Sequence, residues 1–308
     1  MKKLFKISGG AVVFLVAVGI LSVIGLYFFT WFRNKEDIDQ RDLEHWEYTE
    51  KGIIKQAKEI ELEGHKDTCW LFVHGYTSVP NEFENYATEI NEEFGDYVYV
   101  PRLYWHGTKP SDLLGYKVTD WKNQILEKYN SLESNCQEIN MVGFSLWGLI
   151  SLWVAQEKIE NFGRLYLIAP FIRLNYVENN WFSIEEYADD VWEELVYWSK
   201  INIAQVNKPQ AEENHIAYWN FPFEPITSSF DFYQKVRNNL SVIEIPVQIH
   251  HWEKDVTNNI QGSEKIYDQI SSEKKEFHKY PDSNHVLMRD YAKNKVLENI
   301  MEFEKQFR

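Results

Sequence analysis

The sequence has few residues of the kinds that bind metals or phosphate groups. Its 308 residues include two cysteines, and it has no Cys-x-x-Cys pair, no glycine-rich phosphate loop and no cluster of residues at metal-ligand spacing. Basic residues are also outnumbered, 32 against 47 acidic ones, which gives a formal net charge of −15. Nucleic-acid binding needs clustered Lys and Arg, so we expect no nucleic-acid partner. We also expect no cofactor and no metal, and nothing in the sequence indicates an obligate protein partner.

Charged side chains are absent from Ile7 to Phe32, a run longer than the roughly 20 residues that span a bilayer. Basic residues near a span prefer the cytoplasm, so the lysines before the run favour a cytoplasmic N-terminus and an extracytoplasmic body, although Arg33 and Lys35 act against this. The alternative is a cleavable signal peptide, with an apolar core of about 7 to 15 residues and a small-x-small cleavage site. This run ends instead in bulky residues, so we predict an uncleaved membrane anchor over residues 1–32.

Strand-like and helix-like segments alternate after a charged spacer at 33–55. The strands are expected at 68–74, 96–103, 138–143, 164–170, 245–252 and 275–280. The helices are expected at 81–94, 119–131, 146–157, 261–271 and 290–306. This alternation predicts an α/β fold, a mostly parallel sheet flanked by helices, with its core at 56–170 and 241–308.

The alternation breaks off over residues 171–240, which we predict to be a helical cap or lid insertion. An insertion at this place would lie over the carboxyl ends of the strands, where open α/β sheets bind ligands. The segment contains several tryptophans, which could line an acyl-chain pocket or pack a small lid. Both alternatives stay open for Trp181, Trp192, Trp198 and Trp219.

A serine, an aspartate and a histidine each follow a predicted strand. Ser145 lies in the run Met-Val-Gly-Phe-Ser-Leu-Trp-Gly, Asp255 follows the strand at 245–252, and His285 follows the strand at 275–280. A serine hydroxyl needs a histidine to accept its proton and an acid to orient that histidine. The order Ser, acid, His at strand ends is that of one class of hydrolases. By itself the serine segment fits a buried helix equally well, because its second glycine comes one residue late for Gly-x-Ser-x-Gly.

Several blocks together resemble the α/β-hydrolases, in particular the small bacterial carboxylesterases and monoacylglycerol lipases. The blocks are LFVHGYTSVPNEF, VPRLYWHGTKPSDLLGYKVTDW, MVGFSLWG, HHWEKDVTNN and YPDSNHVLMRD. The resemblance covers roughly residues 68–170 and 240–306. It implies the α/β-hydrolase fold, here with a cap insertion and an N-terminal transmembrane helix.

The resemblance also implies a role for each site residue. Ser145 is expected to be the nucleophile, His285 the general base and Asp255 the acid that orients it. Backbone N–H groups of Tyr76 and Leu146 are expected to bind the oxyanion. The implied function is a membrane-anchored serine hydrolase of small-molecule or lipid-derived carboxylic esters. Two alternatives remain: hydrolysis of another bond, such as a thioester or peptide, or a binding protein that has lost catalysis.

Tryptophans replace family glycines at three turns, those of Trp105, Trp147 and Trp252. A bulky ring at 147 must point away from the contact between helix and strand, or the turn must shift. The replacements could narrow the pocket, or they could mark relaxed catalysis.

The remaining histidines and the two cysteines carry simpler expectations. His250 and His251 are adjacent on a strand and face opposite sides, so we expect structural roles for both, as also for His74 and His106 in turns.

In the family's strand order, the strands near Cys69 and Cys136 are parallel neighbours. A disulfide is therefore permitted if the body is outside the cytoplasm, but a register change of one or two residues, about 3.3 Å each, would prevent it.

Overall fold

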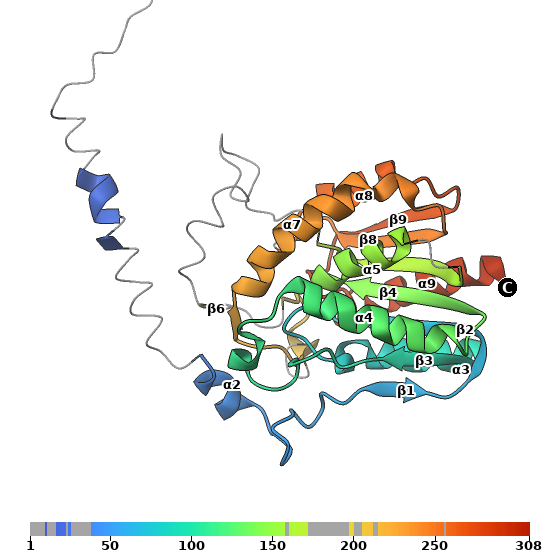
Figure 1. Ribbon diagram of the computed structural model, residues 1–308, viewed down its shortest axis with the longest axis horizontal. Helices are drawn as coiled ribbons and strands as arrows, with labels where there is room; N and C mark the ends of the chain where they lie inside the picture. Colours follow the sequence, from blue (N-terminus) through green and yellow to red (C-terminus); the bar gives the residue numbers. More distant parts are fainter. Residues whose placement is uncertain are drawn as a thin grey trace, which may run out of the picture.

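A seven-stranded sheet forms the centre of the computed structural model (Figure 1). The structure describes residues 10, 17–22, 24–25, 38–157, 160–171, 197–199, 205–211, 215–255 and 257–308. All neighbouring strands of this sheet pair in parallel except the first, which pairs antiparallel with β3. In spatial order the strands are β1 (Ile60–Leu62), β3 (Asp96–Val100), β2 (His65–Val73), β4 (Glu138–Phe144), β5 (Phe162–Ile168), β8 (Val247–Trp252) and β9 (Lys275–Tyr280).

Helices cover both faces of the sheet, as the alternating sequence pattern predicts. One apolar cluster joins one set of strand side chains to α4 (Val118–Glu133), α5 (Leu146–Gln156), α7 (Glu224–Asn238) and α8 (Ile260–Gln269). A second cluster joins the other set to α3 (Glu84–Phe94) and α9 (Lys293–Glu304). Strands β2 and β4 contribute to both clusters because successive side chains of a strand point to opposite faces. The expected α/β fold, a mostly parallel sheet flanked by helices, is confirmed.

Element boundaries differ from the expected ones where the sequence has a turn-forming residue. The helix expected at 81–94 begins with a 3-10 turn at Pro80–Phe83 and is α-helical from Glu84. The strand expected at 96–103 ends at Val100, because the next residue is Pro101, which has no N–H to continue a ladder. The final helix begins at Lys293, three residues later than expected.

The predicted cap interval contains α7 and a small two-stranded ribbon. The ribbon pairs β6 (Tyr197–Ser199) antiparallel with β7 (Asn220–Pro222). Helix α7 packs against α4 and α5 rather than standing apart from the sheet. Trp181, Trp192 and the side chain of Trp198 lie outside the described residues, so the extent of the cap stays a prediction.

Most of the predicted anchor lies outside the described residues. In the part of the chain that the structure does describe, no helix is long and apolar enough to cross a membrane. The anchor and its orientation therefore stay predictions.

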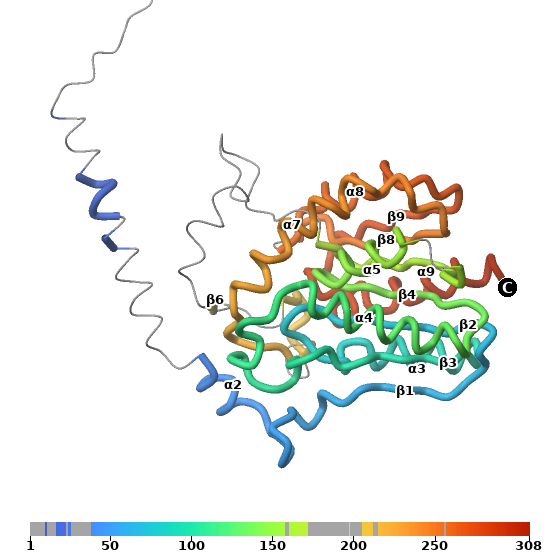
Figure 2. The backbone as a smooth tube through the Cα atoms, in the orientation of Figure 1, coloured from blue at the N-terminus to red at the C-terminus, as the bar shows by residue number. Residues whose placement is uncertain are grey.

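From Ile38 onward the predicted spacer is packed against the body. The short helix α2 (Gln40–His45) carries Asp42, a buried carboxylate that accepts N–H bonds from Trp219 and Asn220 in the cap interval. Asp39 accepts bonds from the N–H and the hydroxyl of Ser111 at 2.7 and 2.6 Å. Figure 2 shows this segment and the C-terminus at opposite ends of the molecule, and the arrow of β4 in Figure 1 points toward the α2 end. The chain thus enters the body on the side of the strands' carboxyl ends.

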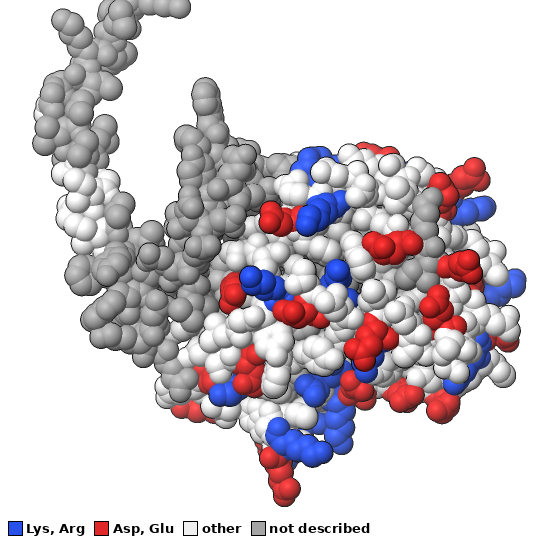
Figure 3. All heavy atoms as spheres, viewed as in Figure 1, with Lys and Arg blue, Asp and Glu red and all other residues white. Residues whose placement is uncertain are grey.

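On the face drawn in Figure 3, acidic and basic side chains are interspersed. The net negative charge of the chain is thus not gathered there into a single acidic field. This pattern is typical of a solvated surface.

A disulfide joins Cys69 in β2 to Cys136, two residues before β4, with the two Cα atoms 5.9 Å apart. The register of β2 on β4 pairs Cys69 with Ile139, so Cys136 reaches Cys69 from the residues that precede β4 and not from the ladder itself. The pairing that the sequence left open is therefore formed.

Replacing Cys69 and Cys136 by serine should lower the free energy of unfolding by about 4 kcal/mol, because the bond closes a loop of 67 residues in the unfolded chain. Urea unfolding of the full chain in detergent measures this difference, and wild type treated with reductant should match the variant. Equal unfolding midpoints with and without the bond would contradict the expectation.

Candidate active site

Ser145 lies on a sharp turn between β4 and α5 with φ 54° and ψ −127°, a conformation that a residue with a side chain rarely adopts. The turn depends on a close approach of the helix to the strand. A Cβ on Gly143 would lie 2.2 Å from Ser151 Oγ and 2.9 Å from Gly148 Cα, so only glycine fits there. Gly148 in turn lies against Pro170. Gly148 thus provides close packing, although it comes one residue late for the usual motif.

The ring of Trp147 points away from this contact, which is one of the two alternatives that the sequence left open. It is fully buried on the helix-α4 side, with its centroid 5.1 Å from that of Trp121, 5.7 Å from His106 and 6.0 Å from Tyr76. The tryptophan at this position therefore extends an aromatic wall beside the nucleophile turn.

The other two glycine replacements lie elsewhere. Trp105 has a positive φ of 63°, a backbone conformation that favours glycine, and the residue is 41% exposed. Its carbonyl accepts bonds from Thr108 Oγ and Tyr218 Oη, which stabilise the turn. Trp252 is buried in the apolar cluster on the α3 and α9 face. Of the three rings, it is Trp147 that contacts the predicted oxyanion segment.

Ser145, His285 and Asp255 come together in one hydrogen-bonded chain. Ser145 Oγ lies 2.9 Å from His285 Nε2, and His285 Nδ1 lies 2.7 Å from Asp255 Oδ2. The second oxygen, Oδ1, accepts the backbone N–H groups of Thr257 and Asn258 at 2.7 and 2.9 Å. Three residues distant in sequence thus form the arrangement that a nucleophilic serine needs.

The carboxyl of Asp255 is ionised in this setting. Its burial acts to raise its pKa, but the charge of protonated His285 and hydrogen bonds from His251 and His285 outweigh burial and hold the pKa below its ordinary value. An ionised acceptor keeps the proton on His285 Nδ1. Nε2 is then free to accept the hydroxyl proton of Ser145.

The segment after β2 approaches the nucleophile turn through Gly75. A Cβ at Gly75 would lie 2.6 Å from the ring of Phe144, the residue before the serine, so glycine is required here too. The Phe144 ring also lies 5.0 Å from that of His285. The backbone of Tyr76, next to Gly75, is therefore near the turn. Leu146 is the first residue of α5, so its N–H has no carbonyl partner within the helix.

Glu82 supports this segment, and sequence reasoning missed it. Its carboxylate, 4% exposed, accepts the N–H of Gly75 at 3.0 Å. Burial raises the pKa of Glu82, while the Gly75 N–H, Arg289, Ser78 and His285 oppose the rise. No motif marks Glu82 in the sequence, because the contact depends on how the turn before α3 folds back.

The turn histidines have the structural roles expected of them. His74 Nε2 accepts the N–H of Leu103 at 3.3 Å, and its Nδ1 lies 3.1 Å from the carbonyl of Gly75. Burial lowers the pKa of His74 to about 3, so the ring is neutral. His106 Nδ1 lies 3.1 Å from the carbonyl of Tyr104. Within the described residues, no group of three or more His, Cys, Asp or Glu is placed to hold a metal ion.

His250 and His251 point to opposite faces of β8, as expected for neighbours on a strand. His250 bonds to Tyr280 Oη at 2.8 Å and to Gln248 Oε1 at 2.9 Å on the α9 side. His251 instead reaches the acid, with Nε2 3.3 Å from Asp255 Oδ2. That contact was not foreseen.

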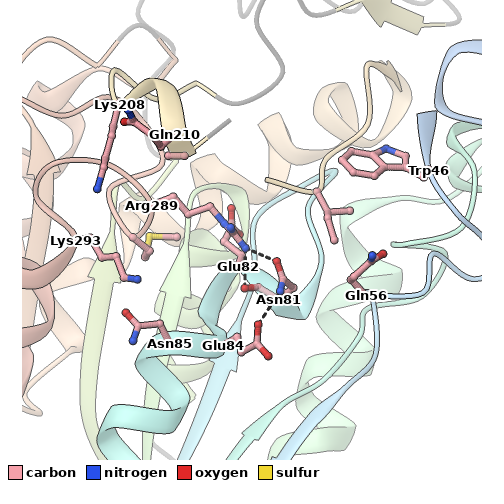
Figure 4. A pocket seen from close by; sticks show the side chains of 13 residues that line it. Trp46, Gln56, Asn81, Glu82, Glu84, Asn85, Lys208, Gln210, Arg289 and Lys293 are labelled. Carbon is pink, nitrogen blue, oxygen red and sulfur yellow. Dashed lines mark hydrogen bonds between the residues drawn. The ribbon is translucent and has the colours of Figure 1, made fainter. Parts of the chain in front are cut away.

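A cavity of about 460 Å³ with a mixed polar and apolar lining lies beside Glu82 (Figure 4). Three cationic side chains, Lys208, Arg289 and Lys293, share its lining with Glu82 and Glu84. Arg289 bonds to the carbonyl of Asn81 at 2.8 Å, which ties the histidine loop to the turn before α3. Neither Ser145 nor His285 lines this cavity, so it is separate from the triad.

The fold and the buried Ser-His-Asp arrangement define an α/β-hydrolase. The family model described as "Serine aminopeptidase, S33" matches residues 64–292, about three quarters of the chain, and the chain belongs to this family.

The chain is also similar to two curated bacterial proteins. It is 26% identical over 237 residues to the thermostable monoacylglycerol lipase of Bacillus sp. (strain H-257), covering 76% of this chain and 88% of the relative. It is 24% identical over 245 residues to a carboxylesterase of Bacillus subtilis (strain 168), covering 77% and 92%. The fold matches a solved structure from work on the metagenome-derived lipolytic enzymes LipS and LipT, with a TM-score of 0.71, 22% identity and coverage of 82% and 99%.

Changing Glu82 to Leu should lower the free energy of unfolding by about 1–3 kcal/mol, because the buried N–H of Gly75 loses its acceptor, whereas Glu82→Gln keeps an acceptor. A carboxyl whose folded pKa is raised loses stabilisation as pH rises through that pKa. Glu82→Gln should therefore gain stability relative to wild type as pH rises from about 4 to 8. Urea unfolding at both pH values tests this, and a difference that does not change with pH would refute it.

Proposed function

We propose that the chain is a membrane-anchored serine hydrolase that cleaves carboxylic esters through an acyl-enzyme. The observation that carries the proposal is the continuous chain from Ser145 Oγ to His285 at 2.9 Å and from His285 to Asp255 at 2.7 Å. It is supported by the strained backbone at the serine, which exposes the hydroxyl on a turn.

In the proposed reaction, Ser145 Oγ attacks the ester carbonyl while His285 Nε2 takes the hydroxyl proton. The carbonyl oxygen becomes an oxyanion that accepts the N–H groups of Tyr76 and Leu146. Collapse of this intermediate breaks the ester bond, and His285 gives its proton to the departing alcohol. Water then attacks the acyl group with the same histidine as base, and the carboxylic acid leaves. Asp255 stays ionised throughout and stabilises the imidazolium.

An ester of a small or lipid-derived acyl group is the proposed substrate class. Support comes from the two similar Bacillus proteins, which are named as a monoacylglycerol lipase and a carboxylesterase. Tyr76, which is partly exposed, also offers an apolar ring next to the predicted oxyanion segment, and the fully buried Trp121 and Trp147 pack behind it. We propose the cap interval, residues 171–240, as the segment that covers this side of the site.

We further propose that residues 1–32 anchor the chain with its N-terminus in the cytoplasm and its body outside. The uncharged run and the lysines that precede it support an anchor with this orientation. The Cys69–Cys136 disulfide supports an extracytoplasmic body, because such bonds persist mainly in oxidising compartments.

Ser145→Ala should abolish labelling by a fluorophosphonate probe and lower the hydrolysis of a short nitrophenyl ester about 10⁶-fold, with unchanged thermal unfolding. The matched control is Ser131→Ala, an exposed serine on α4, which should keep full activity. Undiminished labelling of Ser145→Ala would overturn the assignment of the nucleophile. Absence of labelling in wild type would favour a binding protein, and cleavage of thioesters or peptides in preference to esters would favour the other hydrolase class.

Deleting residues 1–37 should move the body from the membrane fraction to the supernatant and leave its activity on a soluble ester unchanged. The deletion ends just before Ile38, where the continuously described part of the chain begins, so it removes none of the described contacts of α2. Fractionation of cells after carbonate washing measures the change. A deleted chain that stays in the membrane fraction, or a full chain found in the supernatant, would contradict the proposed anchor.

A further inference from the structure

The carboxylate of Asp255 lies between two histidines. His285 Nδ1 is 2.7 Å from its Oδ2, and His251 Nε2 is 3.3 Å from the same oxygen. On the far side of the second ring, His251 Nδ1 lies 2.7 Å from the hydroxyl of Ser263 in α8. A buried chain Ser263–His251 therefore meets the chain Ser145–His285 at one carboxylate oxygen.

The hydrogen-bond partners fix where the protons lie on His251. Its Nε2 faces two acceptors, Asp255 Oδ2 and the carbonyl of Asn258, each at 3.3 Å, so this nitrogen must carry a hydrogen. The hydroxyl of Ser263 has a ring nitrogen, Nδ1, within hydrogen-bond distance and can donate to it. A neutral imidazole with its hydrogen on Nε2 satisfies every one of these contacts.

Burial excludes a second reactive centre here. His251 and Ser263 are both 0% exposed and Asp255 is 3% exposed, so no substrate reaches the Ser263 hydroxyl. Ser145, by contrast, is partly exposed. The inner chain can thus act on the reaction only through the carboxylate that the two chains share.

We propose that His251 is a positioning residue, oriented by Ser263, whose Nε2–H holds the Asp255 carboxylate in place and weakens its pull on the proton of His285. This inference rests on the proposed function. Asp255 Oδ1 is already held by the N–H groups of Thr257 and Asn258, so His251 restrains the oxygen that faces the base.

The consequence is a wider acidic range of activity. Catalysis needs a neutral His285 ring, whose Nε2 can accept the proton of Ser145. A hydrogen bond donated to Asp255 stabilises the carboxylate and lowers its attraction for the imidazolium, which favours the neutral ring that catalysis needs. Among the described residues, His285 interacts with the carboxylate of Asp255 and, from the turn before α3, with that of Glu82. His251 contacts the Asp255 carboxylate.

The test compares three variants by the pH dependence of kcat/KM on a nitrophenyl ester. His251→Leu removes the donor and fills a similar volume. His251→Gln keeps a neutral N–H that can reach the carboxylate. His250→Leu is the matched control, because His250 is the neighbouring histidine, equally buried, but it bonds on the opposite face of the sheet.

We expect His251→Leu to shift the acidic midpoint upward by about half to one pH unit and to lower kcat about fivefold, the usual effect of one lost hydrogen bond, with little change in KM. His251→Gln should restore most of both, and His250→Leu should keep the wild-type midpoint. An unmoved midpoint in folded His251→Leu, or an equal shift in His250→Leu, would overturn the proposal.

A measurement on wild type covers the case in which His251→Leu does not fold. Nitrogen-15 NMR of the histidine rings should show a hydrogen on Nε2 of His251, whose signals are assigned by their loss in His251→Gln. A hydrogen on Nδ1 alone would overturn the proposal. Failure of the proposed function can be distinguished from failure of this inference. In the first case wild type would not react with a fluorophosphonate, whereas the tautomer of His251 is measured without any activity.

Discussion

The close approach of α5 to β4 is the constraint on which the site depends. The two elements meet at Gly143 and Gly148, where no side chain fits. This contact forces the intervening turn to be tight and holds Ser145 at a positive φ that it would not adopt alone. The hydroxyl is thereby presented at the carboxyl edge of the sheet, where His285 and Asp255 arrive from later strands.

Other parts of the site are positioned by their contacts with that turn. Phe144, the residue before the serine, packs on Gly75 and beside the ring of His285, so one side chain lies between the predicted oxyanion segment and the predicted base. Glu82 holds Gly75 from the other side. His251 in the same way supports Asp255, because its Nε2 lies 3.3 Å from the Asp255 carboxylate. Gly75, next to the predicted oxyanion donor, and Asp255, the predicted acid, are thus each held by a buried polar partner.

The sequence predicts the parts of this site that depend on chain order. Strands and helices follow from hydrophobic period, and the position of Ser145, Asp255 and His285 after strands follows from that pattern. Contacts that depend on which way a side chain points toward another element cannot be predicted from chain order. The alternation of β8 predicts that His250 and His251 face opposite ways, but it does not tell which of the two faces Asp255. That depends on how the turn after β8 returns toward the strand.

The same limit applies to the elbow, the cysteines and Glu82. The sequence shows that Gly148 comes one residue late for the usual motif. Its packing on Pro170 cannot be predicted without knowing where the chain after β5 lies. The disulfide depended on a strand register that one residue of slippage would have changed. Glu82 is close in sequence to the oxyanion segment, but its contact with Gly75 arises from the 3-10 turn at Pro80–Phe83, which the pattern did not predict.

The most direct test of the central claim is to trap the acyl-enzyme. Wild type mixed with a nitrophenyl ester, quenched in acid during turnover and digested for mass spectrometry, should carry one acyl group per chain on the peptide that contains Ser145. An acyl group on another residue, or hydrolysis without any acylated chain, would contradict the account.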